Sequence, residues 1–136
     1  MNKISDCYRL RDLTKAVNQQ LQFFAYFVFM FTLLGEVHRI PVGLRSNGVK
    51  VSHDGRRVYI SNGGDGNVSV IDTATNTVIA TVAVGQRPWN MALTPDGKKL
   101  YVANGRSNSV SVIDTTDNKH ITDIPVGNLP WGVVIH

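Results

Sequence analysis

The sequence predicts an all-β fold, a partial β-propeller built from four-stranded antiparallel blades. Two observations support this prediction. First, a unit of 42 residues occurs twice without a gap, so that Tyr59 aligns with Tyr101 and Trp89 aligns with Trp131. Second, each unit divides into short apolar runs separated by Gly, Pro, Asn and Asp, the residues that form tight turns. A period of about 40–45 residues with short strands is typical of propeller blades, whereas a β-sandwich requires no fixed period.

Each full unit is expected to contain four strands, whose limits follow the turn residues. They are 47–52, 56–61, 68–72 and 78–84 in the first unit, and 89–94, 98–103, 110–114 and 120–126 in the second. The turn Pro95-Asp96-Gly97 is one example, because Pro presets a negative φ and Gly accepts a positive one. One such sheet cannot bury both of its apolar faces alone, so neighbouring blades are expected to pack face to face.

The repeat begins abruptly near Glu36, which divides the chain into residues 1–35 and residues 36–136. We expect the outer strand of one blade, two complete blades, and the inner strand of a following blade. The N-terminal part contains Leu21–Leu34, an uncharged run that does not fit the period and for which we expect a helix. Two interpretations of this run stay open. A signal or membrane anchor would place the protein in the periplasm or at a membrane, although a full span needs about 20 residues. The other is a buried helix or a start that is not native to the repeat.

The net charge of +4 does not predict a nucleic acid partner. Residues 1–50 hold seven Lys/Arg and three Asp/Glu, a balance of +4, whereas residues 51–136 hold seven of each. The repeats therefore offer no cationic face to nucleic acid. The single cysteine, Cys7, excludes an internal disulfide and a thiolate metal cluster.

No catalytic residue and no metal ligand is predicted. The four histidines share neither a register nor a short spacing, which convergent metal ligands would need. Asp72 and Asp114 each end a strand ahead of a Thr, where a carboxylate can accept backbone N–H bonds. Ser69 and Ser111 lie in mid-strand without a nearby His in the sequence, so nothing indicates an activated nucleophile.

The repeat resembles that of the YVTN-type β-propeller family. Tyr59–Asn62 (YISN) and Tyr101–Asn104 (YVAN) are similar to the family's YVTN motif, and Pro95–Leu100 matches the turn that precedes it. The segments at Pro88-Trp89 and Pro130-Trp131 look most like propellers found beside pyrroloquinoline-quinone-dependent oxidation systems in bacteria. The resemblance implies a mostly exported, often non-catalytic protein. Relatives with similar blades include the d1-haem domain of nitrite reductases and some lactonases.

The resemblance covers residues 36–136 and leaves residues 1–35 unmatched. The chain holds about 2.4 units, whereas the family usually has about seven blades, within the range of known propellers. Two further departures concern single positions. Ser46-Asn47 stands where the other copies have Pro-Trp, and His53 stands where the second unit has Pro95.

A ligand site is predicted on the loops that lead from the outer strand of one blade to the inner strand of the next. In propellers these loops rim the central channel. Here they carry Arg87, Trp89, Asn90 and Trp131, which offer planar donors and apolar area. Packing between blades is the alternative role for the two tryptophans.

The function that follows is a binding or scaffold module without catalytic activity. The alternative is part of a quinone- or haem-associated oxidoreductase accessory protein, or a lactonase-like hydrolase. No cofactor can be named from the sequence. The expected partners are a small molecule or protein at the channel mouth, and other propeller chains at the open blade edges.

Overall fold

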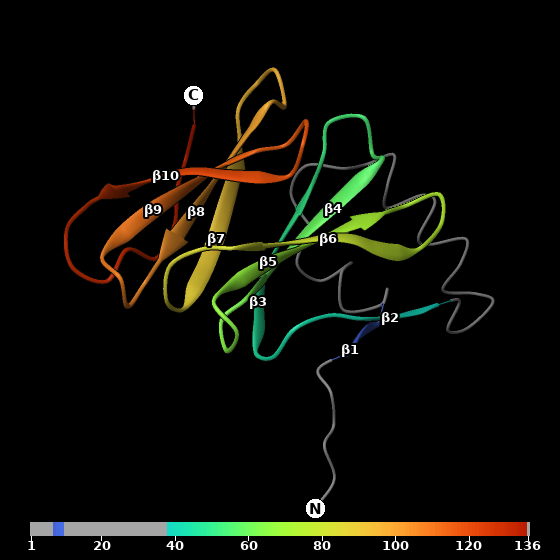
Figure 1. The fold of residues 1–136 in the computed structure, drawn as a ribbon, viewed down its shortest axis with the longest axis horizontal. Coiled ribbons are helices and arrows are strands. Elements are labelled where there is room, and N and C mark those ends of the chain that lie inside the picture. Colours follow the sequence, from blue (N-terminus) through green and yellow to red (C-terminus); the bar gives the residue numbers. More distant parts are fainter. Residues whose placement is uncertain (1–6, 10–37, 136) are drawn as a thin grey trace, which may run out of the picture.

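The computed structural model describes residues 7–9 and 38–135 (Figure 1). In this part of the chain the fold is all-β, as predicted. The strands are β1 (Cys7–Arg9), β2 (Arg39–Pro41), β3 (Ser46–Val51), β4 (Arg57–Asn62), β5 (Asn67–Asp72), β6 (Thr77–Ala83), β7 (Pro88–Leu93), β8 (Lys99–Asn104), β9 (Ser109–Asp114) and β10 (Lys119–Pro125). Within the same residues, no helix combines the length and hydropathy needed to cross a bilayer.

Two four-stranded antiparallel sheets form the predicted blades (Figure 1). Blade 1 has the order β3-β4-β5-β6, and blade 2 has the order β7-β8-β9-β10. The pairing registers repeat with the sequence, since Tyr59 pairs with Val70 in blade 1 and Tyr101 pairs with Val112 in blade 2. The prediction of the blades is therefore confirmed, with strand limits within one or two residues of those expected.

The turns repeat as well as the strands. Gly55 and Gly97 occupy the same position of their units and have φ values of 71° and 70°. Asn76 and Asn118, one turn later, have φ values of 54° and 56°. These left-handed conformations favour Gly and, to a lesser degree, Asn. The same positions therefore reverse the chain in both blades.

Aspartates stabilise these turns, which confirms the structural role predicted for Asp72 and Asp114. Asp72 Oδ1 accepts hydrogen bonds from the backbone N–H groups of Ala74 and Thr75, at 2.8 and 3.1 Å. These bonds, that of Thr75 above all, hold the pKa of Asp72 below its ordinary value. Asp114 accepts from the backbone N–H of Thr116 at 2.8 Å in the same way.

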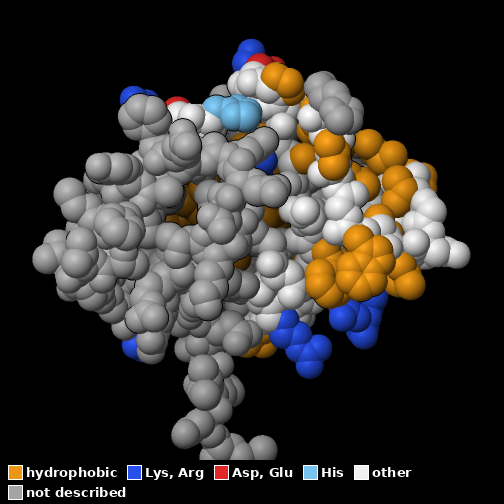
Figure 2. Space-filling view, turned by 180° about the vertical axis from the view of Figure 1, so that it is seen from behind, with side chains coloured by type: hydrophobic (Ala, Val, Ile, Leu, Met, Phe, Trp, Pro, Cys, Tyr) orange, Lys and Arg blue, Asp and Glu red, His pale blue; other side chains and the backbone are white. Residues whose placement is uncertain are grey.

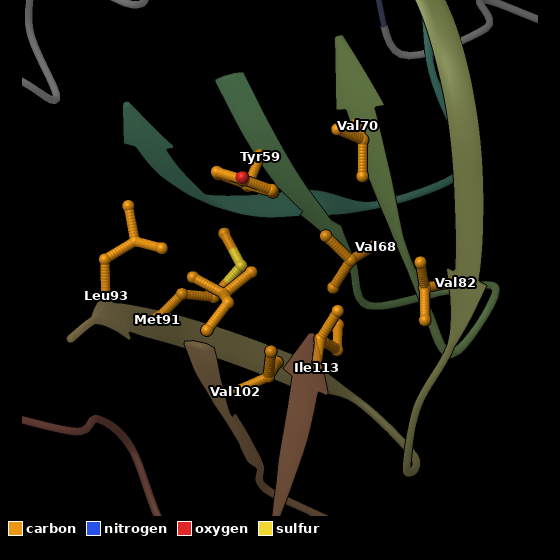
Figure 3. Packing of buried hydrophobic residues seen from close by; sticks show 9 residues of the cluster. Tyr59, Val68, Val70, Val82, Met91, Leu93, Val102 and Ile113 are labelled. Carbon is orange, nitrogen blue, oxygen red and sulfur yellow. The ribbon is translucent and has the colours of Figure 1, made fainter. Parts of the chain in front are cut away.

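The main core lies between the two blades (Figure 3). Its buried side chains come from both sheets: Tyr59, Val68, Val70 and Val82 from blade 1, and Met91, Leu93, Leu100, Val102 and Ile113 from blade 2. Burying a side chain of this size contributes about 1.5–3 kcal/mol relative to leaving it exposed. The expectation that the blades pack face to face is thus correct.

A second apolar cluster covers the opposite face of blade 1. It consists of buried Val58, Ile60 and Ile71, against which Ile40 and Val42 pack. Val58 and Ile60 occupy the same repeat positions as Leu100 and Val102 of blade 2. The same face of each blade is therefore apolar in both units.

The ends of the repeat region differ in part from expectation. β2 is the expected outer strand of a preceding blade, but it pairs antiparallel with β1, a strand that the sequence did not indicate. The expected inner strand of a following blade is absent from the described residues after β10, because no second strand is there to pair with it. The helix expected for Leu21–Leu34 lies outside the described residues.

Candidate functional site

The predicted site lies on the loops that precede the inner strands, and these loops have an unusual backbone. Arg45, Arg87 and Leu129 occupy equivalent positions and have φ values of 51°, 56° and 52°. A left-handed conformation costs a residue with a side chain about 1–2 kcal/mol, so glycine would be the least strained choice here. The strain is present at every copy of the position within the described residues.

Repeated backbone hydrogen bonds hold each loop against the turn after the second strand of the next sheet. Gly63 N–H donates to Arg45 O at 2.9 Å, and the equivalent Gly105 N–H donates to Arg87 O at 3.0 Å. Arg106 N–H donates to Gln86 O at 3.1 Å. Arg87 is therefore fixed at its backbone, while its side chain is exposed.

The side chains of three predicted site residues form a stack. The Arg87 guanidinium lies over the Trp89 ring, 4.9 Å from its centroid. The Trp89 and Trp131 centroids are 5.0 Å apart, with an angle of 37° between the rings. An exposed cation–π contact contributes about 0.5–1 kcal/mol, and an aromatic pair about 0.5–1.5 kcal/mol beyond burial. The stack is therefore ordered by its own contacts.

The two tryptophans differ in exposure. Trp89 is partly buried against Gly105, where an added Cβ would lie 2.7 Å from the indole Nε1. Trp131 is 71% exposed. Trp89 therefore combines the packing role with a place in the stack, whereas Trp131 offers its surface to solvent. We call Arg87, Trp89, Asn90 and Trp131 the rim.

Asn90 completes the rim beside Gly132, the residue that follows Trp131. Its side chain is exposed at the surface, and its Oδ1 accepts a hydrogen bond from the Met91 N–H at 2.7 Å. A Cβ added at Gly132 would lie 3.6 Å from Asn90 Nδ2, which places Asn90 beside the segment that carries Trp131. The structure thus brings the four predicted residues together, but not all of them on loops: Arg87 and Trp131 lie outside strands, whereas Trp89 and Asn90 belong to the start of β7.

Sequence reasoning missed the two residues that join the rim to blade 1. Gly48 N–H donates to Ser61 Oγ at 2.8 Å, and Ser61 Oγ donates to Trp89 O at 2.6 Å. A Cβ at Gly48 would lie only 2.2 Å from Trp89 O. The available signal was weak: a glycine within an expected strand, which often marks the close approach of another backbone.

A buried amide in blade 2 has an unpaired oxygen behind the rim. Asn62 of blade 1 uses both ends of its amide, since its Nδ2 donates to Ser69 Oγ at 2.8 Å and its Oδ1 accepts from Ser46 Oγ at 3.0 Å. The equivalent Asn104 keeps the donor contacts, but its Oδ1 has no partner. Pro88 stands where Ser46 stands in blade 1 and offers no hydroxyl.

The described residues contain one arrangement of Ser, Asp and His. Ser111 Oγ donates to Asp123 Oδ1, and His120 Nε2 lies 3.0 Å from the same oxygen. The hydroxyl of Ser111 holds the pKa of Asp123 below its ordinary value. Because the carboxylate stands between the other two groups, His120 is not placed to take the serine proton, as a nucleophile would require. In the part of the chain that the structure describes, no three His, Cys, Asp or Glu side chains form a group that could hold a metal ion.

The chain is similar to several solved propeller structures. Hydrazine synthase from Kuenenia stuttgartiensis is 38% identical over 67% of this chain and 27% of its own, with a TM-score of 0.63. The dihydro-heme d1 dehydrogenase NirN, in complex with DHE, is 30% identical over 68% of this chain and 20% of its own, with a TM-score of 0.62. AztD from Citrobacter koseri, 21% identical over 71% of this chain and 28% of its own with a TM-score of 0.62, supports the fold alone.

The matches cover most of this chain but only a small part of each solved structure. The chain spans 20% to 28% of the length of these three structures. No curated protein sequence matches it. A family model described as "Lactonase, 7-bladed beta-propeller" matches residues 13–123, which is more than half of the chain. On this match, and on the two blades that it spans, the chain belongs to the lactonase family of seven-bladed β-propellers.

Proposed function

We propose that the chain acts as a binding or scaffold module whose contact surface is the rim. The observation that carries this proposal is the stack of Arg87, Trp89 and Trp131, with the indole of Trp131 mostly exposed. An ordered aromatic surface beside a cation binds a ligand at a low cost in side-chain entropy, because its side chains already hold one another in place.

The exposed charge of Arg87 supports the same proposal. Its left-handed backbone is shared with Arg45 and Leu129, so the backbone conformation belongs to the repeated loop. The side chain is what distinguishes Arg87, because its guanidinium is exposed and lies over the Trp89 ring. The side chain of Arg87 is therefore the group that we assign to the ligand.

The chemistry of the rim defines the class of ligand. The face of Trp131 suits a flat apolar group, and the guanidinium of Arg87 suits a carboxylate or phosphate with its planar donors. The amide of Asn90, exposed beside them, supplies a further donor. The best ligand is an aromatic or other flat group that bears a negative charge.

Tryptophan fluorescence tests this proposal, because both tryptophans of the chain belong to the rim. Aromatic carboxylates should quench the emission more strongly than the matching uncharged amides. Arg87→Gly should remove the preference for the carboxylates, and Trp131→Ala should remove the binding itself. Arg56→Ala, which changes an exposed arginine paired with Asp54 in a turn, should have no effect. A wild-type emission that no probe in the set alters would refute the proposal.

A second candidate function is enzymatic. The family match favours a lactonase-like hydrolase, and the similarity to the dihydro-heme d1 dehydrogenase NirN favours part of a haem- or quinone-associated oxidoreductase accessory protein. Proton release from added lactones, followed in a pH-stat, tests the first of these. Haem titration followed by absorbance tests the second. Activity or haem binding that survives Trp131→Ala and Arg87→Gly would separate either function from the rim.

The finer family assignment and the location are also proposals. The motifs at Tyr59–Asn62 and Tyr101–Asn104 support a YVTN-type propeller of the kind associated with quinone-dependent oxidation. The apolar run Leu21–Leu34 supports a periplasmic or membrane-associated location. Cell fractionation of the full chain, compared with a chain that lacks this run, tests the location; equal recovery of both in the cytosol would contradict it.

A further inference from the structure

A second arginine, Arg106, lies next to Arg87 at the end of blade 2 that carries the rim. Gly105 N–H donates to Arg87 O at 3.0 Å. The next residue, Arg106, donates its N–H to Gln86 O at 3.1 Å. Both arginine side chains are exposed, and neither guanidinium has a carboxylate partner among the described residues. Two cationic residues are therefore held at neighbouring backbone positions without a counter-charge.

The equivalent contacts of blade 1 involve only one cation. Gly64 stands where blade 2 has Arg106, and its N–H donates to Leu44 O at 2.9 Å. Arg45 is the counterpart of Arg87. Because the backbone contact forms with a glycine as well as with an arginine, the loop does not require the side chain of Arg106.

A carboxylate that is present in blade 1 is also missing from blade 2. In blade 1, Asp65 Oδ2 accepts a hydrogen bond from Leu44 N–H at 2.8 Å. At the same position of blade 2, Ser107 Oγ accepts from Gln86 N–H at 2.5 Å. The hydrogen bond that orders the loop is thus kept, whereas the negative charge beside the arginines is replaced by a neutral hydroxyl.

The rim end of blade 2 is consequently cationic. Residues 84–87 and 105–108 contain two arginines and no acid, a charge of +2, whereas residues 42–45 and 63–66 of blade 1 contain one arginine and one aspartate. These loops lie at the lower end of the molecule in Figure 1. Figure 2 shows Lys and Arg side chains beside hydrophobic ones at its lower edge, and the Asp and Glu side chains visible in that view lie near the upper edge. Blades pack through the faces of their sheets, so a neighbouring blade leaves this end uncovered.

We infer that Arg106 is a second anion-binding residue beside the rim, and that the ligand is a flat group with two separate carboxylates or phosphates. This inference rests on the proposed function, in which Arg87 and the two tryptophans hold the flat part of the ligand and its first negative charge. Each guanidinium presents planar donors that match one carboxylate or phosphate. Two arginines with no acid beside them therefore attract a dianion more strongly than a monoanion. The aspartate that blade 1 has in place of Ser107 would repel the second charge.

Tryptophan emission of the full chain, titrated with benzoate and with the three benzenedicarboxylates, tests the inference. The dicarboxylate whose spacing fits best should reach half-quenching at a concentration about fivefold lower than benzoate, the effect of one exposed ion pair. Arg106→Gln should raise that concentration to the value for benzoate and leave the value for benzoate unchanged. Ser107→Asp should also abolish the preference for the dicarboxylate, and it keeps an acceptor for the Gln86 N–H, as Asp65 does for Leu44 in blade 1.

The matched control is Lys98→Gln. It removes one positive charge from an exposed residue in the turn between β7 and β8, at the opposite end of blade 2, and should leave the preference intact. Two results would overturn the inference and leave the proposed function standing: equal half-quenching concentrations for benzoate and all three dicarboxylates, or a preference that Arg106→Gln leaves unchanged. If neither benzoate nor any dicarboxylate altered the emission, the proposed function would fail and this inference with it.

Discussion

The close contact between the blades at Gly48 predicts a large effect from a single methyl group. In Gly48→Ala the added Cβ would lie 2.2 Å from Trp89 O, whereas ordinary van der Waals contacts begin at 3.4 Å. Relief therefore requires a displacement of 1.2 Å, the difference between these two distances. The obstructing atom belongs to the backbone of β7, so no side-chain rotation can provide it. Strands β3 and β7 must move apart.

The magnitude follows from what the displacement breaks. Ser61 Oγ is bonded to Gly48 N and Trp89 O at 2.8 and 2.6 Å, and a shift of this size takes at least one bond beyond hydrogen-bond distance. A buried polar group left without a partner costs about 1–3 kcal/mol. Replacement of Gly by Ala also stabilises a protein by about 0.4–1 kcal/mol, because alanine reduces the conformational entropy of the unfolded chain. A broken bond leaves both its donor and its acceptor unpaired, so after subtraction of the gain from alanine we expect Gly48→Ala to lower the free energy of unfolding by about 1–5 kcal/mol.

Urea unfolding followed by tryptophan emission and circular dichroism measures this loss. The matched control is Gly132→Ala, at the same position two units later, where the nearest atom to an added Cβ is Asn90 Nδ2 at 3.6 Å. That variant meets no clash, so it should keep or slightly raise the free energy of unfolding, by about 0.4–1 kcal/mol at most. If the two variants were equally stable, the blades would not approach each other at Gly48 as described.

Three further predictions concern the polar groups between the strands. Ser61→Ala should cost about 1–3 kcal/mol in urea unfolding, because the two backbone groups that it bridges lose their partner; an unchanged midpoint would contradict this. Pro88→Ser should be more stable than Pro88→Ala by about 0.5–1.5 kcal/mol, because the serine gives Asn104 Oδ1 a donor while both variants lose the proline ring; equal midpoints would contradict this. The pKa of Asp123 is lowered below 3.8, chiefly by the Ser111 hydroxyl, so its contribution is present above pH 3.8 and is lost as the pH falls further. Asp123→Asn should flatten the acid side of the stability curve there, and a parallel curve would count against it.

The sequence predicted the fold well because the fold is periodic. A 42-residue offset aligned Tyr59 with Tyr101, and the structure gives both the same register and nearly the same strand limits. Turn residues such as Gly55 and Gly97 marked where the chain reverses. Local patterns of this kind are visible in one sequence because each is repeated within it.

The site was predicted only in part, because the contacts that hold its residues in place join positions far apart in the sequence. The rim residues were found from their place between blades, but their stacking distances depend on contacts across the interface. Ser61 was not indicated, since its partners Gly48 and Trp89 are 13 and 28 residues away. The strand β1 was missed for a related reason: Cys7–Arg9 lies outside the repeat, and its pairing with β2 has no copy among the strands that the structure describes.

The register of the core has a consequence for how the length of such a chain can change. Leu100 and Val102 meet blade 1 from the same repeat positions that Val58 and Ile60 occupy on the far side of blade 1. Each unit therefore carries both faces of the blade–blade interface, one toward the preceding blade and one toward the following blade. Duplication or loss of a whole 42-residue unit joins existing surfaces and needs no new complementary residues. An insertion of half a unit would instead place an outer strand at a position of the interface that an inner strand occupies in the other blades. Gene segments of this kind can therefore lengthen or shorten in single steps of one blade.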